Sequence, residues 1–139
     1  MTTKSMCGRG LKIAAGVAVV FGAMTVLSGG RALFGGIEAR AAVGNAVPFV
    51  LWFNFMAGFA YVVAGIGLVL RRRWAFWLSL AILIVTVLIF AGFGIHILRG
   101  GAHEMRTIGA MILRTGVWAM ISVMAACSLG RTSSELRIQ

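Results

Sequence analysis

Polar chemistry in this chain is concentrated in one stretch, residues 96–118, with the sequence HILRGGAHEMRTIGAMILRTGVW. The polar side chains of this stretch that are best suited to ligand binding or ion pairing are His96, His103, Glu104, Arg106 and Arg114. Histidine nitrogen and methionine sulfur are ligands for copper or haem, so metal binding at the two histidines is one alternative. Their spacing of seven residues matches no strong ligand motif. We therefore favour simple hydrogen bonding and predict no cofactor, with haem or copper as the alternative.

Arg114 lies inside an otherwise apolar segment, about 10 Å from Thr107 at 1.5 Å per residue. A charged side chain at this depth in a bilayer costs about 2.5 kcal/mol or more unless it reaches the interface. It could extend outward to Glu104 or to a lipid phosphate. Alternatively it faces other helices, where Asn54 is the expected partner at similar depth. A buried arginine of this kind could hold helices together or bind an anion, and the sequence leaves both roles open.

Two Glu-x-Arg elements occur in similar surroundings. Residues 35–52, GGIEARAAVGNAVPFVLW, align with residues 100–118 when one residue is inserted in the second copy. The match suggests two tandem repeats, 11–70 and 74–129, with chance similarity as the alternative. Each glutamate could favour a helix start while each arginine reaches lipid headgroups. The more specific alternative is ion pairing between the two copies, of Glu38 with Arg106 and of Glu104 with Arg40.

The composition is that of a membrane protein. Of the 139 residues, 60% are hydrophobic, which is more apolar surface than one small soluble core could bury. A membrane helix needs roughly 20 mainly apolar residues. The predicted fold is therefore an all-α integral membrane protein, a single domain over 1–139 with four helices in an antiparallel bundle. The expected helices are 11–29, 47–70, 74–98 and 107–129, and the first is expected to be a retained span and not a cleaved signal peptide.

The charge distribution predicts an orientation. The formal net charge is +10, from 13 basic and three acidic residues. Both termini and the Arg71–Arg73 turn carry eight basic residues, against four in the other two loops. The positive-inside rule then puts the termini in the cytoplasm, and we expect the inner membrane of a bacterium. Because the basic residues flank apolar segments and form no binding stripe, nucleic acid is not an expected partner.

Small residues recur at helical spacing within the apolar segments. Ala14, Ala18 and Gly22 share one face of the first segment, and Ala60 and Ala64 share a face of the second. Such faces let helix backbones approach closely in lipid. We interpret them as packing surfaces. Cys7 and Cys127 form no CxxC pair, which argues against a redox or metal motif.

No set of residues resembling a nucleophile with its base, and no phosphate-binding loop, occurs in the sequence. The chain is therefore not expected to be an enzyme. The first interpretation is an accessory or structural subunit of a membrane complex, or a homo-oligomer, whose partners are lipids and other membrane subunits. The alternatives are a small transporter or channel for an anionic or metal solute, and a haem- or copper-binding electron carrier.

Overall fold

The computed structural model describes residues 2–44 and 46–135, with side chains over 8–44 and 46–128. Four helices of this part of the chain are long and apolar enough to cross a membrane, which confirms the predicted all-helical membrane fold. The side chains of Lys4, Cys7 and Arg131, and all of Arg137, lie outside the described residues. The helices are α1 (Thr2–Phe34), α2 (Ile37–Val43), α3 (Pro48–Val69), α4 (Arg73–Leu98) and α5 (Met105–Glu135).

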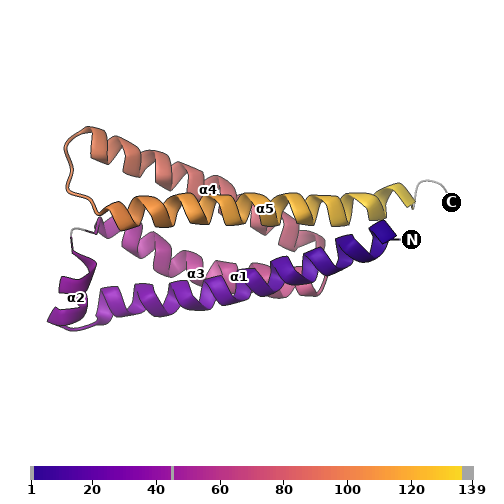
Figure 1. Cartoon of the computed structure of the whole chain (residues 1–139), viewed down its shortest axis with the longest axis horizontal. Helices are drawn as coiled ribbons and strands as arrows, with labels where there is room; N and C mark the ends of the chain where they lie inside the picture. The colour runs from indigo at the N-terminus through magenta and orange to yellow at the C-terminus, as the bar shows by residue number, and fades with distance from the viewer. Residues whose placement is uncertain (1, 45, 136–139) are drawn as a thin grey trace.

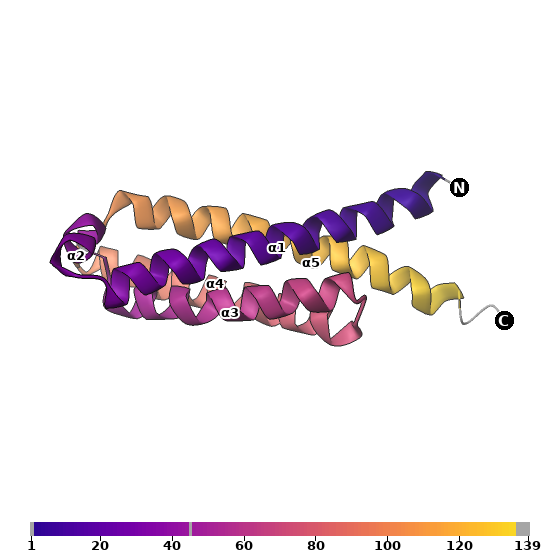
Figure 2. The same cartoon turned by 90° about the horizontal axis from the view of Figure 1, so that it is seen from below.

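The chain runs back and forth along one long axis (Figures 1 and 2). Both termini and the α3–α4 turn lie at one end, which we call the terminal end. The short helix α2 and the α4–α5 loop lie at the other, which we call the α2 end. The long helices therefore place residues near the starts of α3 and α5 at the same end of the molecule.

Helices α1 and α5 extend at both ends beyond the bounds expected from hydropathy: α1 begins at Thr2 and not at residue 11, and α5 begins at Met105 and not at residue 107. Helix α1 continues through Gly29 and Gly30 to Phe34, because those glycines pack against Phe55 of α3 and the backbone there stays helical. Helix α5 likewise continues past residue 129 to Glu135. Apolar character marks the length of chain suited to lipid, whereas backbone hydrogen bonding can extend a helix beyond it.

Glycines allow α1 and α3 to pack in very close contact. A Cβ atom built on Gly22 would lie 2.8 Å from the carbonyl oxygen of Gly58. One built on Gly65 would lie 3.0 Å from the carbonyl oxygen of Ala15. We call Gly22, Gly58 and Gly65, with Ala15, the glycine seam. Since Ala15 meets Gly65 and Gly22 meets Gly58, the two helices run in opposite directions.

The small residues expected to form packing surfaces lie in or beside this seam. Ala14, Ala18 and Ala64 are buried, and Ala60 packs at the edge of the core. Gly22, which was also expected in a packing surface, makes the closest approach to a backbone atom in the seam, whereas its α3 counterparts Gly58 and Gly65 were not predicted from the sequence. Close packing of this kind provides the van der Waals attraction that holds helices together in lipid.

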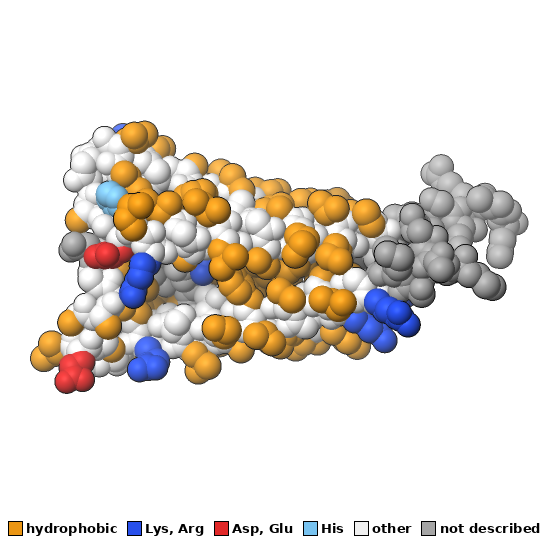
Figure 3. Space-filling view, in the orientation of Figure 1, with side chains coloured by type: hydrophobic (Ala, Val, Ile, Leu, Met, Phe, Trp, Pro, Cys, Tyr) orange, Lys and Arg blue, Asp and Glu red, His pale blue; other side chains and the backbone are white. Residues whose placement is uncertain are grey.

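Helix α4 is the least enclosed of the four spans. In the apolar 18-residue stretch of α4, 22% of the residues are buried, against 33% in the corresponding stretch of each of the other three spans. Leu88 is 64% exposed, and the hydrophobic side chains form a broad surface between the charged groups nearer the ends (Figure 3). Much of the α4 surface is therefore not covered by the other helices of the chain. Its buried residues form a single stripe, Ala75, Ser79, Ile82, Thr86 and Phe93.

The turn between α3 and α4 is short and ends α3 with a left-handed residue. Arg71 has φ of 51°, and the amide of Arg72 donates to the carbonyl of Gly67 across 3.0 Å. This hydrogen bond gives a donor to a carbonyl that would otherwise have no partner at the end of α3. Arg71, Arg72 and Arg73 are all exposed, so their charges lie on the surface of the terminal end.

The two Glu-x-Arg elements have different local structures. Glu38 and Arg40 lie within α2, a separate helix that the sequence analysis did not predict. Glu104 lies in the α4–α5 loop, and Arg106 belongs to the first turn of α5. Helix α2 is followed directly by Gly44, whose φ of 61° lies in the left-handed region that favours glycine. The tandem repeat therefore stays a prediction from sequence.

Candidate functional site

Arg114 turns inward, toward the other helices. It is 5% exposed and donates a hydrogen bond from Nη1 to Oδ1 of Asn54 on α3. The same nitrogen lies 3.8 Å from the sulfur of Met111, and the guanidinium carbon lies 5.8 Å from the ring centroid of Tyr61. An amide oxygen and an aromatic face both attract a cation. The structure thus brings Arg114 and Asn54 together, and the partners of Arg114 tie α5 to α3.

Tyr61 connects this arginine to an aromatic cluster. Its ring centroid lies 4.8 Å from that of Trp118 on α5 and 6.0 Å from that of Phe21 on α1. Tyr61 and Trp118 are both fully buried. Neither residue was predicted from the sequence as part of a site, although its spacing carried a signal. Trp118 follows Arg114 by four residues and Tyr61 follows Asn54 by seven, and both spacings place the two residues on the same face of a helix.

Several buried hydroxyl and N–H groups lie in or beside this cluster. Thr86 and Trp118 are the polar neighbours of the Tyr61 hydroxyl. Five buried atoms in the described part of the chain nevertheless have no hydrogen bond, and each carries a hydrogen to donate. These atoms are Tyr61 Oη, Thr86 Oγ1, Arg114 Nε, Trp118 Nε1 and Ser122 Oγ. Because buried donors are normally satisfied, such a group suits an acceptor such as water or a small anion. We call these residues, together with Asn54, the donor cluster.

The two histidines hold the α4–α5 loop. The Nε2–H of His96 donates to the carbonyl of Ala102 across 3.3 Å, and the Nδ1–H of His103 donates to that of Gly101 across 3.2 Å. The ring of His96 also meets Phe49 edge to face. Within the described residues, no group of three or more His, Cys, Asp or Glu side chains could hold a metal ion. The geometry of the two rings fits loop anchoring.

The first turn of α5 is tied to α2 through the main chain. Nη2 of Arg106 donates to the carbonyl of Ala42 across 3.0 Å. The Glu104 side chain packs against Gly44, where an added Cβ would lie 3.1 Å from its carboxyl carbon. Glu38 is exposed on α2. Arg106 therefore reaches the helix that carries Glu38, but through a backbone carbonyl, and the cross-pairing of the two copies stays a prediction.

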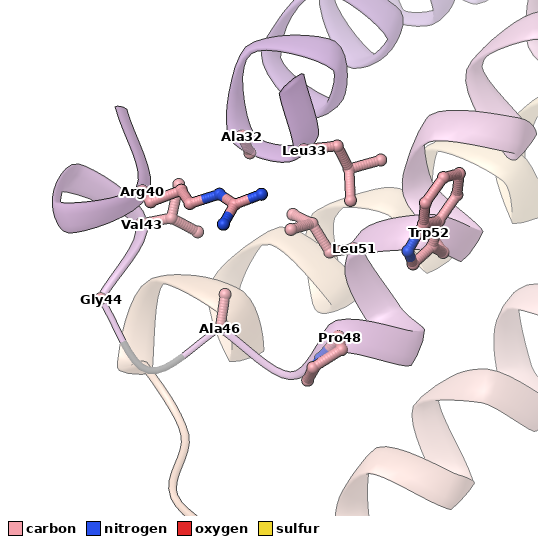
Figure 4. A pocket seen from close by; sticks show the side chains of 9 residues that line it. All are labelled: Ala32, Leu33, Arg40, Val43, Gly44, Ala46, Pro48, Leu51 and Trp52. Atoms are coloured by element: carbon pink, nitrogen blue, oxygen red, sulfur yellow. The ribbon is translucent and has the colours of Figure 1, made fainter. Parts of the chain in front are cut away.

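Arg40 points into a cavity of about 340 Å³ at the α2 end. The cavity lies between α2, the last turn of α1 and the first turns of α3, and the guanidinium extends toward Leu33 and Leu51 (Figure 4). We call it the Arg40 pocket. Of the described residues that line it, Arg40 alone is charged; the others are Ala32, Leu33, Val43, Gly44, Ala46, Pro48, Leu51 and Trp52.

No protein-family model, curated protein or solved structure matches the chain. The role of the protein must therefore be argued from the two features just described, the donor cluster and the Arg40 pocket, and from the surface of the bundle.

Proposed function

We propose that this chain is a non-catalytic subunit of a membrane assembly, formed with other copies of itself or with a larger complex. We further propose that it resides in the inner membrane of a bacterium with both termini in the cytoplasm. The basic residues at the termini and in the Arg71–Arg73 turn support this orientation. The proposal includes no enzymatic activity and no cofactor.

The observation that carries this proposal is the exposure of α4. Its buried stripe is narrow, and large apolar side chains such as Ile84 and Leu88 are more than half exposed. Meanwhile several polar side chains within the spans are buried, and one of them, Arg114, ties α5 to α3 through Asn54. A bundle that buries much of its polar chemistry and leaves α4 less covered than its other spans suits packing against another protein in the membrane.

Photo-crosslinking from α4 tests this proposal. A photoreactive amino acid replaces Leu88 in cells, and the matched control replaces Leu27 of α1, since the two leucines are 64% and 67% exposed. The expected result is a protein adduct of reproducible mass from position 88 and none from position 27. Adducts from neither position would mean that lipid covers α4, which contradicts the proposal.

A second candidate function, anion binding or transport, is favoured by the donor cluster. Its buried groups combine one cation with several hydroxyl and N–H groups that could donate to an anion. Chloride flux into liposomes containing the purified protein tests it, with Arg114→Leu beside Arg114→Lys. Transport requires flux in the natural protein, loss with leucine and partial retention with lysine. Equal or absent flux in all three proteins would contradict it.

The absence of a cofactor is tested by an absorption spectrum and metal analysis of protein purified under mild conditions. We expect neither a haem band nor stoichiometric copper, because the two rings contact different carbonyls of the α4–α5 loop and, in the described part of the chain, no third His, Cys, Asp or Glu side chain joins them as a ligand. A haem band that disappears in His96→Ala or His103→Ala would overturn this part of the proposal and favour an electron carrier.

A further inference from the structure

We propose that the Arg40 pocket binds an anionic phospholipid, with the guanidinium of Arg40 contacting the lipid phosphate. This inference does not depend on whether the chain is a subunit of an assembly. It rests on the chemistry of the pocket lining and on the position of the pocket at the end of the membrane-spanning helices.

The lining of the pocket combines one cation with apolar surface. Arg40 supplies the charge, while Leu33, Leu51 and Trp52 supply hydrocarbon and aromatic contact. A guanidinium presents several donors in a plane and binds phosphate oxygens well. An occupant that satisfies the whole lining therefore needs both an anionic group and an apolar part, which is the construction of a phospholipid.

The position of the pocket fits the boundary between headgroups and acyl chains. Its walls come from the last turn of α1 and the first turns of α3, where the candidate membrane spans Gly8–Phe34 and Pro48–Val69 end and begin. Trp52 is 49% exposed at this level and meets Phe34 edge to face. Tryptophan is enriched at the membrane interface, so a lipid phosphate would lie close to Arg40.

Charge favours a net anionic lipid over a zwitterionic one. Among the described residues that line the pocket, none has a carboxylate that could pair with the ammonium of a choline headgroup. At the α2 end, the basic residues Arg31, Arg40, Arg99 and Arg106 outnumber the acidic residues Glu38 and Glu104, and this local positive charge adds to the attraction for anionic headgroups. Phosphatidylglycerol should therefore bind in preference to phosphatidylcholine.

Native mass spectrometry of the full chain in detergent tests the assignment, with phosphatidylglycerol or phosphatidylcholine added as the probe. The variant Arg40→Gln removes the cation from the pocket. The matched control Arg31→Gln removes an exposed cation from the end of α1 that does not line the pocket. A third variant, Ala46→Leu, occupies space in the pocket without changing its charge.

The expected result is one tightly bound phosphatidylglycerol, weakened about tenfold in Arg40→Gln, as the loss of one charge-assisted contact implies. Ala46→Leu should weaken it as well, and Arg31→Gln should not. Equal weakening in Arg31→Gln and Arg40→Gln would show general attraction to basic residues and overturn the proposal. Unchanged binding in Arg40→Gln would also overturn it.

The free anion is distinguished from the lipid by competition. Inorganic phosphate at 100-fold excess should leave bound phosphatidylglycerol in place, because it offers no apolar contact to Leu51 and Trp52. Displacement of the lipid by phosphate would identify a site for a free anion and contradict the lipid assignment. Circular dichroism and a single elution peak establish that each variant is folded.

Discussion

Arg114 is a cation among apolar helices, and its surroundings determine what it can do. One hydrogen bond to Asn54, a sulfur contact and the face of Tyr61 surround the guanidinium, while its Nε has no partner. Removing one member of a buried polar pair usually costs more than replacing both with apolar residues, since the remaining group is left unsatisfied. The pair with Asn54 therefore makes a measurable contribution to stability.

We predict that Asn54→Leu lowers the free energy of unfolding by about 1.5–3 kcal/mol, because Arg114 then loses its oxygen acceptor. The double variant Asn54→Leu with Arg114→Leu should be more stable than Asn54→Leu alone. Reversible unfolding in mixed micelles measures both values. A double variant less stable than either single variant would show that the two residues do not act as a pair.

Sequence reasoning found part of this cluster. Depth along the helices identifies Arg114 and Asn54, because polar residues are rare in spans and position follows from residue number. Tyr61 and Trp118 were not identified, since an aromatic residue in an apolar span suits lipid, the interface and the interior equally well. Deciding between these requires the packing of three helices, which one sequence without a structure does not supply.

At the scale of elements, close helix contact depends on residues without side chains. The glycine seam brings α1 against α3 so tightly that a Cβ on Gly58 would lie 2.9 Å from the backbone nitrogen of Val26. Small-residue spacing in the sequence predicted such packing and identified Gly22, but it did not identify Gly58 or Gly65. Helix α2 was not predicted, because its seven residues are too few to show a helical period.

We predict that Gly58→Ala lowers the free energy of unfolding by about 1–3 kcal/mol, since the added methyl group overpacks the seam. Gly16→Ala is the matched control, because a Cβ there meets nothing within 4 Å. It should leave stability unchanged or raise it by up to about 1 kcal/mol. Equal effects of the two substitutions would mean that α1 and α3 do not pack through Gly58.

The α3–α4 turn gives a prediction of opposite sign. Arg71 has a left-handed backbone, which is costly for a residue with a Cβ, so Arg71→Gly should raise the free energy of unfolding by about 0.5–1 kcal/mol. Arg72→Gly removes the same charge at φ of −81° and should lower stability. Thermal unfolding in detergent compares them, and the reverse order would exclude a strained Arg71.

At the scale of the whole molecule, the fold class followed from composition, whereas the role did not. Hydropathy and length were enough to predict four spans, because the bilayer imposes both. The surface of the bundle adds what composition could not, namely that α4 is more open than the other three spans. That asymmetry depends on how the helices pack, and it is the basis for proposing an assembly.

The most direct measurement of that proposal is the mass of the particle extracted from native membranes with its lipid shell. One chain has a mass of 14.7 kDa. We predict particles that contain several copies of the chain, or one copy with a second protein in fixed stoichiometry, and that dissociate when Leu88 is replaced by Lys but not when Leu27 is. Particles that contain a single copy of the chain and lipid alone would contradict the proposed role as a subunit.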